Sequence, residues 1–178
     1  SAVRHANGYD YWVIAHKFNN NTFYSFLVTC DGIADTVISA AADTLSSNAK
    51  GTVEIGCIKV SPDCKKMAMT INANARLKLF DFNNATGQLT NEVDLVPGVV
   101  GLDAAYGVSF SPDNSRLYAS STAGQAVFQF NMLAGGTAAI IASKQQVGSS
   151  AYYVGSLQLG PDGKIYASTF GANSIAVI

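Results

Sequence analysis

A turn motif that recurs at a spacing of about 50 residues most constrains what this chain can fold into. Each copy places a small residue, a proline and an aspartate between two alternating apolar segments. The three copies are Ser61-Pro62-Asp63, Ser111-Pro112-Asp113 and Gly160-Pro161-Asp162. Proline presets one turn dihedral, and the aspartate carboxylate accepts hydrogen bonds from backbone N–H groups ahead of it. Each copy therefore predicts a hairpin turn, and the repeat length is typical of one β-propeller blade.

The segments around each turn have the period of β-strands. In the three segments before the turns, apolar residues alternate with the polar residues Lys59, Ser109 and Gln158. A second strand follows each turn, and third and fourth strands follow in the two central copies. The third strand is expected at residues 79–83 and 127–131, and the fourth near 89–95 and 137–142. The predicted fold class is all-β, built from four-stranded antiparallel β-propeller blades.

The repeat divides the chain, taken as one domain over residues 1–178, into four units. Their approximate bounds are 9–50, 54–97, 104–147 and 152–178. In the first, diverged unit the inner strand is expected at residues 10–18, the second at 22–29 and a third at 35–41. The last unit stops at a third strand, at residues 173–178. These bounds predict two complete blades between two incomplete ones.

The number of units is small for a closed propeller. The length of 178 residues corresponds to roughly 3.6 blades, whereas propeller rings commonly have about six to eight. The sequence therefore predicts an incomplete fragment of a larger ring, whose remaining blades come from the same protein or from another chain. A genuine four-bladed ring is the alternative.

Composition excludes several classes of protein. A net charge of −1 gives no basic field for nucleic acid. No apolar stretch reaches the length of a transmembrane segment. The three cysteines, Cys30, Cys57 and Cys64, are too few for a disulfide-based scaffold, and their spacing matches no metal site. We therefore expect no metal and no cofactor.

Four stretches carry a resemblance to a known group of proteins. They are HANGYDYWVIAHKFN at residues 5–19, LFDFN at 79–83, YGVSFSPD at 106–113 and LQLGPDGKIY at 157–166. The turn motif by itself is shared by WD40-like and lactonase-like propellers. The longer pattern resembles a propeller region of large secreted Bacteroidetes surface proteins, which are substrates of the type IX secretion system and include gliding-motility adhesins. The resemblance implies a secreted or cell-surface location and a binding or adhesive role, and it names no catalytic residue.

Four residues are candidates for ligand binding. His16 is expected on an inner strand, at the position that Ile58 holds in the next unit, where it could face the central channel. Trp12, Tyr152 and Tyr153 belong to an aromatic-rich set that could stack on sugar rings or bind a peptide. The structural alternatives are a buried, hydrogen-bonded histidine and aromatic packing between blades. Tyr152 and Tyr153 are the pair most expected to be exposed.

Asp63, Asp113 and Asp162 could be read as calcium ligands, because Ca²⁺ binds several oxygen atoms. They lie one to a blade and should be far apart, so a structural role in capping their own turns is favoured.

Three functions remain open. The favoured one is a non-catalytic extracellular module that recognises a protein or carbohydrate. The alternatives are a lactonase-like propeller hydrolase and a structural spacer. The polar inner-strand positions give the hydrolase little support, because they are not the acids, histidines or arginines that such enzymes gather at the channel mouth.

Overall fold

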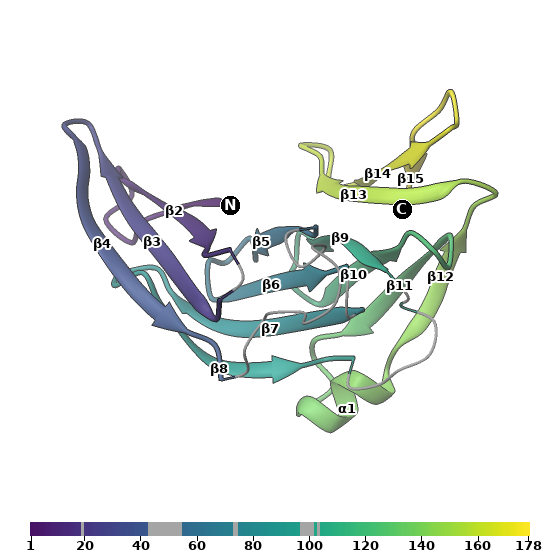
Figure 1. The fold of residues 1–178 in the computed structure, drawn as a ribbon, viewed down its shortest axis with the longest axis horizontal. Helices are drawn as coiled ribbons and strands as arrows, with labels where there is room; N and C mark the ends of the chain where they lie inside the picture. The colour runs from purple at the N-terminus through teal and green to yellow at the C-terminus, as the bar shows by residue number, and fades with distance from the viewer. Residues whose placement is uncertain (19, 43–54, 73–74, 97–101, 103) are drawn as a thin grey trace.

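The chain folds into four antiparallel β-sheets that follow one another along an arc (Figure 1). The computed structural model describes residues 1–18, 20–42, 55–72, 75–96, 102 and 104–178. Within these ranges the structure confirms an all-β chain of propeller blades, with one short helix, α1 (Thr137–Ala142). None of the helices in the described ranges is long and apolar enough to cross a membrane.

Each sheet is one blade, and its strands follow chain order from the inside of the arc outwards. Blade 1 consists of β1 (Ala2–Arg4), β2 (Tyr11–His16), β3 (Thr22–Thr29) and β4 (Gly32–Ala40). Blade 2 consists of β5 (Ile58–Val60), β6 (Lys66–Ile71), β7 (Arg76–Asn83) and β8 (Gln88–Asp94). Blade 3 consists of β9 (Ala105–Phe110), β10 (Arg116–Ser121), β11 (Ala126–Asn131) and β12 (Gln145–Ser149). Blade 4 has three strands, β13 (Tyr153–Leu159), β14 (Ile165–Phe170) and β15 (Ala176–Val177).

Blade 1 corrects the prediction that residues 10–18 form an inner strand. The inner strand is β1, which pairs with β2 through Val3 and Trp12, so His16 lies on the second strand. The segment predicted as a third strand, residues 35–41, belongs to the fourth strand, β4. Blade 1 is therefore complete. Three residues are too few to show a two-residue period, so β1 gave no signal in the sequence.

The strand predicted at residues 137–142 is also wrong, because this segment is α1 and the fourth strand of blade 3 is β12. A short apolar run fits a helix and a strand equally well by periodicity, and its three alanines favour the helix. The unit bounds near residues 50, 54 and 97 lie outside the described ranges.

The core lies between neighbouring blades rather than inside any one of them. Trp12 and Phe23 of blade 1 pack with Phe80 of blade 2, and Leu77 of blade 2 belongs to one cluster with Val108 of blade 3. A third cluster joins blades 3 and 4 through residues that include Val127, Val154 and Leu157. At each described seam, each of the two neighbouring sheets thus buries one apolar face.

The seam between blades 1 and 2 depends on one glycine. The Trp12 side chain is 2% exposed, and its indole N–H donates to the Asn84 carbonyl at 2.9 Å. Gly87 follows in the same turn with φ +73°, and a Cβ atom there would lie 2.8 Å from the Trp12 ring. Glycine alone combines this backbone conformation with that close approach.

Among the described residues, no other blade packs against the outward face of blade 1. Trp12 and Ile14 point toward blade 2, so their neighbours Tyr11 and Val13 point away, since side chains alternate along a strand. Val13 lies opposite Phe26, whose ring stacks on Tyr24. Ile38, which is opposite Tyr24, is 60% exposed. A continuous apolar sheet face is therefore open to solvent.

We expect the 178-residue chain to self-associate in solution, because exposed apolar faces of this kind mark association surfaces. Light scattering should give more than the mass of one chain, and the double substitution Val13→Lys with Ile38→Lys should shift the mass toward the monomer. A wild-type chain that stays monomeric at high concentration would contradict this expectation.

A buried ion pair lies within blade 2. The Lys78 ammonium is 2.7 Å from Glu92 Oε1 and 3.5 Å from Asp94 Oδ2, and only 2% of the Lys78 side chain is exposed. Glu92 Oε2 also accepts a hydrogen bond from the Ala42 backbone N–H, next to the end of blade 1. One buried cluster of charges thus connects two blades.

Lys78→Met should lower the free energy of unfolding by roughly 3–5 kcal/mol, because it leaves largely buried carboxylates without their counter-charge. Lys66→Met is the matched control on the neighbouring strand. It breaks the more exposed ion pair with Asp81 and should cost about 1 kcal/mol or less. Urea unfolding at one fixed protein concentration measures both, and equal losses would contradict the argument.

Candidate functional site

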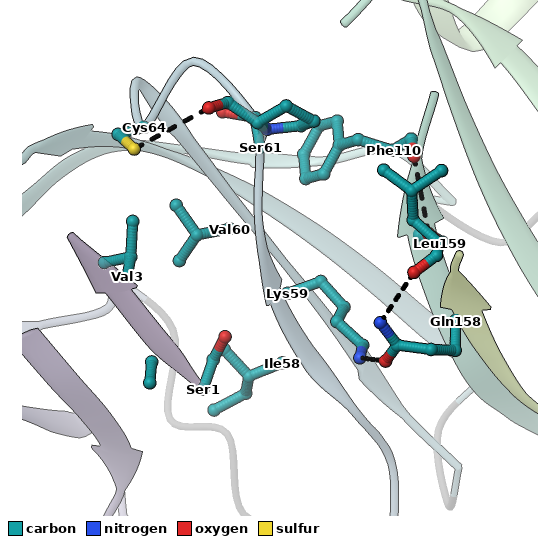
Figure 2. A pocket seen from close by; sticks show the side chains of 13 residues that line it. Ser1, Val3, Ile58, Lys59, Val60, Ser61, Cys64, Phe110, Gln158 and Leu159 are labelled. Carbon is teal, nitrogen blue, oxygen red and sulfur yellow. Dashed lines mark hydrogen bonds between the residues drawn. The ribbon is translucent and has the colours of Figure 1, made fainter. Parts of the chain in front are cut away.

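A cavity of about 560 Å³ lies where the inner strands of the four blades face one another (Figure 2). All four inner strands contribute to its wall. They supply Val3 from β1, Lys59 from β5, Ser109 and Phe110 from β9, and Gln158 and Leu159 from β13. The hairpin turn after β5 adds Ser61. The cavity therefore lies toward the ends of the inner strands that lead into the repeated turns.

Two polar side chains meet in this cavity from sheets that are far apart in sequence. The Lys59 ammonium donates to Gln158 Oε1 at 2.5 Å, and Gln158 Nε2 donates to the Leu159 carbonyl at 3.0 Å (Figure 2). The amide is thus held at both ends, and it fixes the ammonium at the cavity wall. Lys59 is the one charged side chain among the described residues that line the cavity. Ser1 also lines the cavity, and its α-amino group donates to the Ile14 carbonyl at 2.9 Å.

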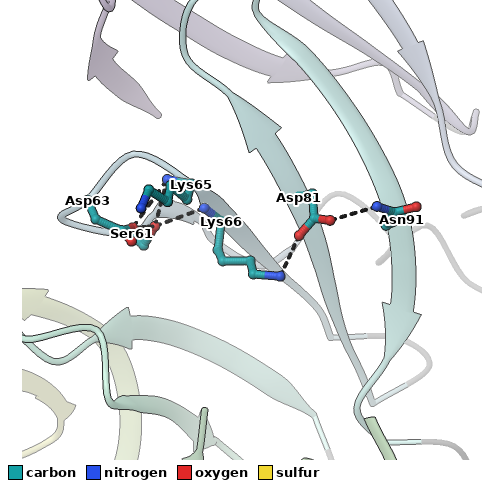
Figure 3. A network of polar contacts seen from close by, with 6 residues as sticks. All are labelled: Ser61, Asp63, Lys65, Lys66, Asp81 and Asn91. Carbon is teal, nitrogen blue, oxygen red and sulfur yellow. Dashed lines mark hydrogen bonds and ion pairs between the residues drawn. The ribbon is translucent and has the colours of Figure 1, made fainter. Parts of the chain in front are cut away.

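The repeated turns next to the cavity are closed by their aspartates (Figure 3). Asp63 Oδ1 accepts from Ser61 Oγ at 2.6 Å and from the Lys65 backbone N–H at 3.2 Å. Ser61 Oγ in turn accepts from the Lys66 backbone N–H at 2.9 Å. Farther along the network, the Lys66 ammonium pairs with Asp81, whose other oxygen accepts from Asn91 Nδ2 at 2.7 Å. The carboxylate of Asp63 is therefore engaged within its own blade.

The other two aspartates make the same kind of contact. Asp113 accepts from Ser111 Oγ at 2.6 Å and from the Ser115 backbone N–H at 3.0 Å. Asp162 accepts from the Lys164 backbone N–H at 3.2 Å and from the Tyr166 hydroxyl at 2.9 Å. Across the described parts of the chain, no three His, Cys, Asp or Glu side chains come together as metal ligands would. The geometry of the three aspartates is that of turn caps.

His16 lies on β2, away from the cavity wall. Its Nε2 donates to the Asn20 carbonyl at 2.7 Å, and its ring packs against Phe23 with 4.8 Å between centroids. Burial lowers the pKa of His16, against a smaller raising effect of the Asn20 hydrogen bond. Trp12 is enclosed in the seam between blades 1 and 2. The structure thus places His16 and Trp12 in packing roles and does not bring them together with Tyr152 and Tyr153.

Tyr153 lies in a second hollow, a groove of about 400 Å³ at the seam between blades 3 and 4. This aromatic groove is lined by Tyr106, Thr122, Tyr153, Gly155, Ser156, Ser168, Thr169 and Phe170. Tyr153 is opposite Phe170 in the β13–β14 pair, and the two ring centroids are 6.5 Å apart. The two rings are 52% and 79% exposed, respectively. Tyr152 is also exposed but lies outside the lining.

The aromatic groove and the cavity lie at opposite ends of the inner strands. Tyr106 and Tyr153 are near the starts of β9 and β13, whereas Phe110 and Leu159, which line the cavity, are the last residues of those strands. Sequence reasoning did not identify Tyr106 or Phe170 as groove residues, because they are distant in sequence from Tyr153. Their positions in the repeat could have identified them. Tyr106 is at the start of an inner strand, and Phe170 is at the end of a second strand.

Comparison with known proteins gives the fold. No protein-family model and no curated protein matches the sequence. Solved structures do match. They include the β-propeller domain of Cps50 (Swd1) from Myceliophteria thermophila, with 11% identity, a TM-score of 0.63, and coverage of 100% of this chain and 52% of that one.

Two further matches are enzymes by their descriptions. Hydrazine synthase from Kuenenia stuttgartiensis has 15% identity, a TM-score of 0.62, and coverage of 98% of this chain and 56% of that one. Virginiamycin B lyase from Staphylococcus aureus has 14% identity, a TM-score of 0.59, and coverage of 99% and 50%. At these identities the likeness shows the fold alone. The chain spans about half the length of the solved structures that it matches.

The turn caps predict a pH dependence of stability at acid pH. Hydrogen bonds from the Ser111 hydroxyl, then from the Ser115 backbone and hydroxyl, lower the pKa of Asp113 to about 2. An unfolded aspartate has a pKa of about 3.9, so the contribution of Asp113 is complete above that pH and is lost as the pH falls toward 2. Wild type should therefore be more stable than Asp113→Asn at pH 6, and this difference should shrink below about pH 4.

Urea unfolding across this pH range measures the difference. Asp31→Asn, in the exposed turn between β3 and β4, is the matched control for the same exchange of side chains and should change the stability little. A difference between wild type and Asp113→Asn that stays constant down to pH 2 would show that the carboxylate charge does not cap the turn.

Proposed function

We propose that this chain is a non-catalytic binding module of a secreted or cell-surface protein and that its propeller scaffold recognises carbohydrate in the aromatic groove. The observation that carries the proposal is the pair of exposed rings, Tyr153 and Phe170, set among hydroxyl-bearing side chains. Carbohydrates present apolar C–H faces together with many hydroxyl groups. A site with flat aromatic surfaces and fixed polar atoms complements both features.

The polar atoms of the groove are already oriented. The Thr122 hydroxyl donates to the Ala104 carbonyl at 3.0 Å, and the Thr169 hydroxyl donates to the Ser174 carbonyl at 2.7 Å. Ser168 Oγ donates to the Ser156 carbonyl at 3.4 Å. A hydroxyl whose proton is engaged in this way keeps its lone pairs, so these oxygens can accept hydrogen bonds from sugar hydroxyls.

The charge of the groove supports a neutral ligand. Its described lining contains aromatic, hydroxyl and glycine residues and no side chain that is charged at neutral pH. A neutral sugar would leave no charge uncompensated there, whereas an acidic peptide would find no cation. The shape and chemistry of the groove therefore favour a neutral carbohydrate over a charged protein segment.

The extracellular location rests on the resemblance of the sequence to the propeller region of secreted Bacteroidetes surface proteins. Adhesion through surface carbohydrate would suit such a location. We also propose that further blades, from the same protein or another chain, cover the open face of blade 1. Recovery of the native protein only from the cytoplasmic fraction of its source organism would contradict the proposed location.

Tyr153→Ala should weaken carbohydrate binding by about fivefold or more, because stacking on an aromatic ring contributes about 1 kcal/mol beyond the buried area. A glycan array identifies the neutral sugar, and calorimetric titration of that sugar measures the loss. Tyr9→Ala is the matched control, since Tyr9 is an exposed aromatic residue of blade 1 outside the groove, and its substitution should leave the affinity unchanged.

Other outcomes would favour the other functions. Equal losses in the two tyrosine variants would place the site outside the groove. If the glycan array gives no hit and the chain captures no partner from host or bacterial surfaces, a structural spacer is the favoured function. Turnover in a lactone and phosphoester screen that is lost in Lys59→Met would favour a lactonase-like hydrolase acting in the central cavity.

A further inference from the structure

We infer that the central cavity is a second binding site, which takes a small oxyanion, the carboxylate or phosphate group of a ligand, against the Lys59 ammonium. This inference goes beyond the carbohydrate site, because the cavity and the aromatic groove lie at opposite ends of β9 and β13. It rests on the wall of the cavity, on the position of one cation in that wall and on the charge around it.

Two contacts fix the position of Lys59, one at its backbone and one at its ammonium group. Its backbone belongs to β5, which pairs with β6, and its ammonium is held at 2.5 Å by the amide of Gln158 on β13. A lysine side chain normally loses considerable conformational entropy when it binds a ligand. In this chain, part of that entropy is already lost in the free protein, because the hydrogen bond to Gln158 holds the ammonium along the cavity wall (Figure 2).

The ammonium keeps donors for a ligand. It carries three N–H groups, and Gln158 is the one side chain of the described residues with a hydrogen bond to it. Two N–H groups therefore remain available. Oxyanions accept charge-assisted hydrogen bonds from an ammonium, and these are shorter and stronger than bonds between neutral groups.

The charge around the cavity favours an anion over a cation or a neutral group. Asp and Glu are absent from its described lining, and Lys59 is partly buried in the wall. The carboxylate of Asp63, which lies in the chain between the lining residues Pro62 and Cys64, is engaged with Ser61 and with the Lys65 backbone. Because water is partly excluded from a lined cavity, the Lys59 ammonium, with no carboxylate in the described lining, attracts anions more strongly than a lysine on an open surface.

The volume of the cavity and the residues that line it suit a small ligand that carries an acidic group. A cavity of about 560 Å³ is in the range of small-molecule sites. Ser109 and Ser61 add polar residues to the lining, and Phe110 and Leu159 add apolar surface. An acidic group at Lys59 with a short apolar or hydroxylated remainder matches this lining.

Equilibrium dialysis with radiolabelled phosphate and radiolabelled acetate tests the inference on the wild-type chain, in excess chloride to suppress non-specific binding. We expect saturable, millimolar binding of at least one of the two anions. Binding of phosphate alone would assign the site to phosphate groups, and binding of acetate alone would assign it to carboxylates. Absence of saturable binding for both would overturn the inference.

Two variants test the role of Lys59 by different routes. Lys59→Met removes the charge and should weaken anion binding by roughly 10- to 100-fold, as expected for loss of a charge-assisted hydrogen bond. Gln158→Glu keeps Lys59 but places a carboxylate beside the ammonium, so it should compete with the anion and weaken binding at least as much. Lys65→Met removes the same charge from an exposed turn residue outside the cavity and should bind like wild type.

Equal weakening in Lys59→Met and Lys65→Met would mean that general charge attracts the anion, and it would overturn the inference. If Lys59→Met binds the anion as tightly as wild type does, the inference is also overturned. Tyr153→Ala should leave anion binding intact, and Lys59→Met should leave sugar binding intact. Failure of the anion site can thus be distinguished from failure of the carbohydrate site.

Discussion

The need to bury both faces of every sheet governs this structure. A blade whose strands carry apolar side chains on two faces is stable only between two neighbours. The described seams meet this need with clusters such as that of Trp12, Phe23 and Phe80. The outward face of blade 1, with Val13 and Ile38, does not meet it within the part of the chain that the structure describes. The arrangement is thus a run of mutually dependent sheets rather than four independent units.

The charged turn residues at the blade ends are satisfied locally. The carboxylates of Asp63, Asp113 and Asp162 close their own hairpins and make no common site. Lys78 is the exception, since its charge is buried inside blade 2 and is compensated there by Glu92 and Asp94. Breaking a buried pair is costly because the remaining charge has no access to water.

The two proposed binding sites lie at the ends of the inner strands. The middles of the inner strands and the described seams are committed to packing, so the inner strands offer side chains to a ligand mainly at their two ends. Lys59 and Gln158 meet at one end and Tyr153 and Phe170 at the other. Solved structures with 11% to 15% identity share the scaffold. Any specificity of this chain must therefore lie in a few such residues and not in the fold.

The sequence alone determined the blade repeat, the turns and the strands of the two central units, because proline, aspartate and a two-residue period act over short distances. It missed β1, which is too short to show a period, and the helical state of residues 137–142. Tertiary structure alone decided that Trp12 is buried, that His16 lies on a second strand, and that Lys59 meets Gln158 across blades. Those contacts join residues far apart in the chain, and no local pattern encodes which sheets come to face one another.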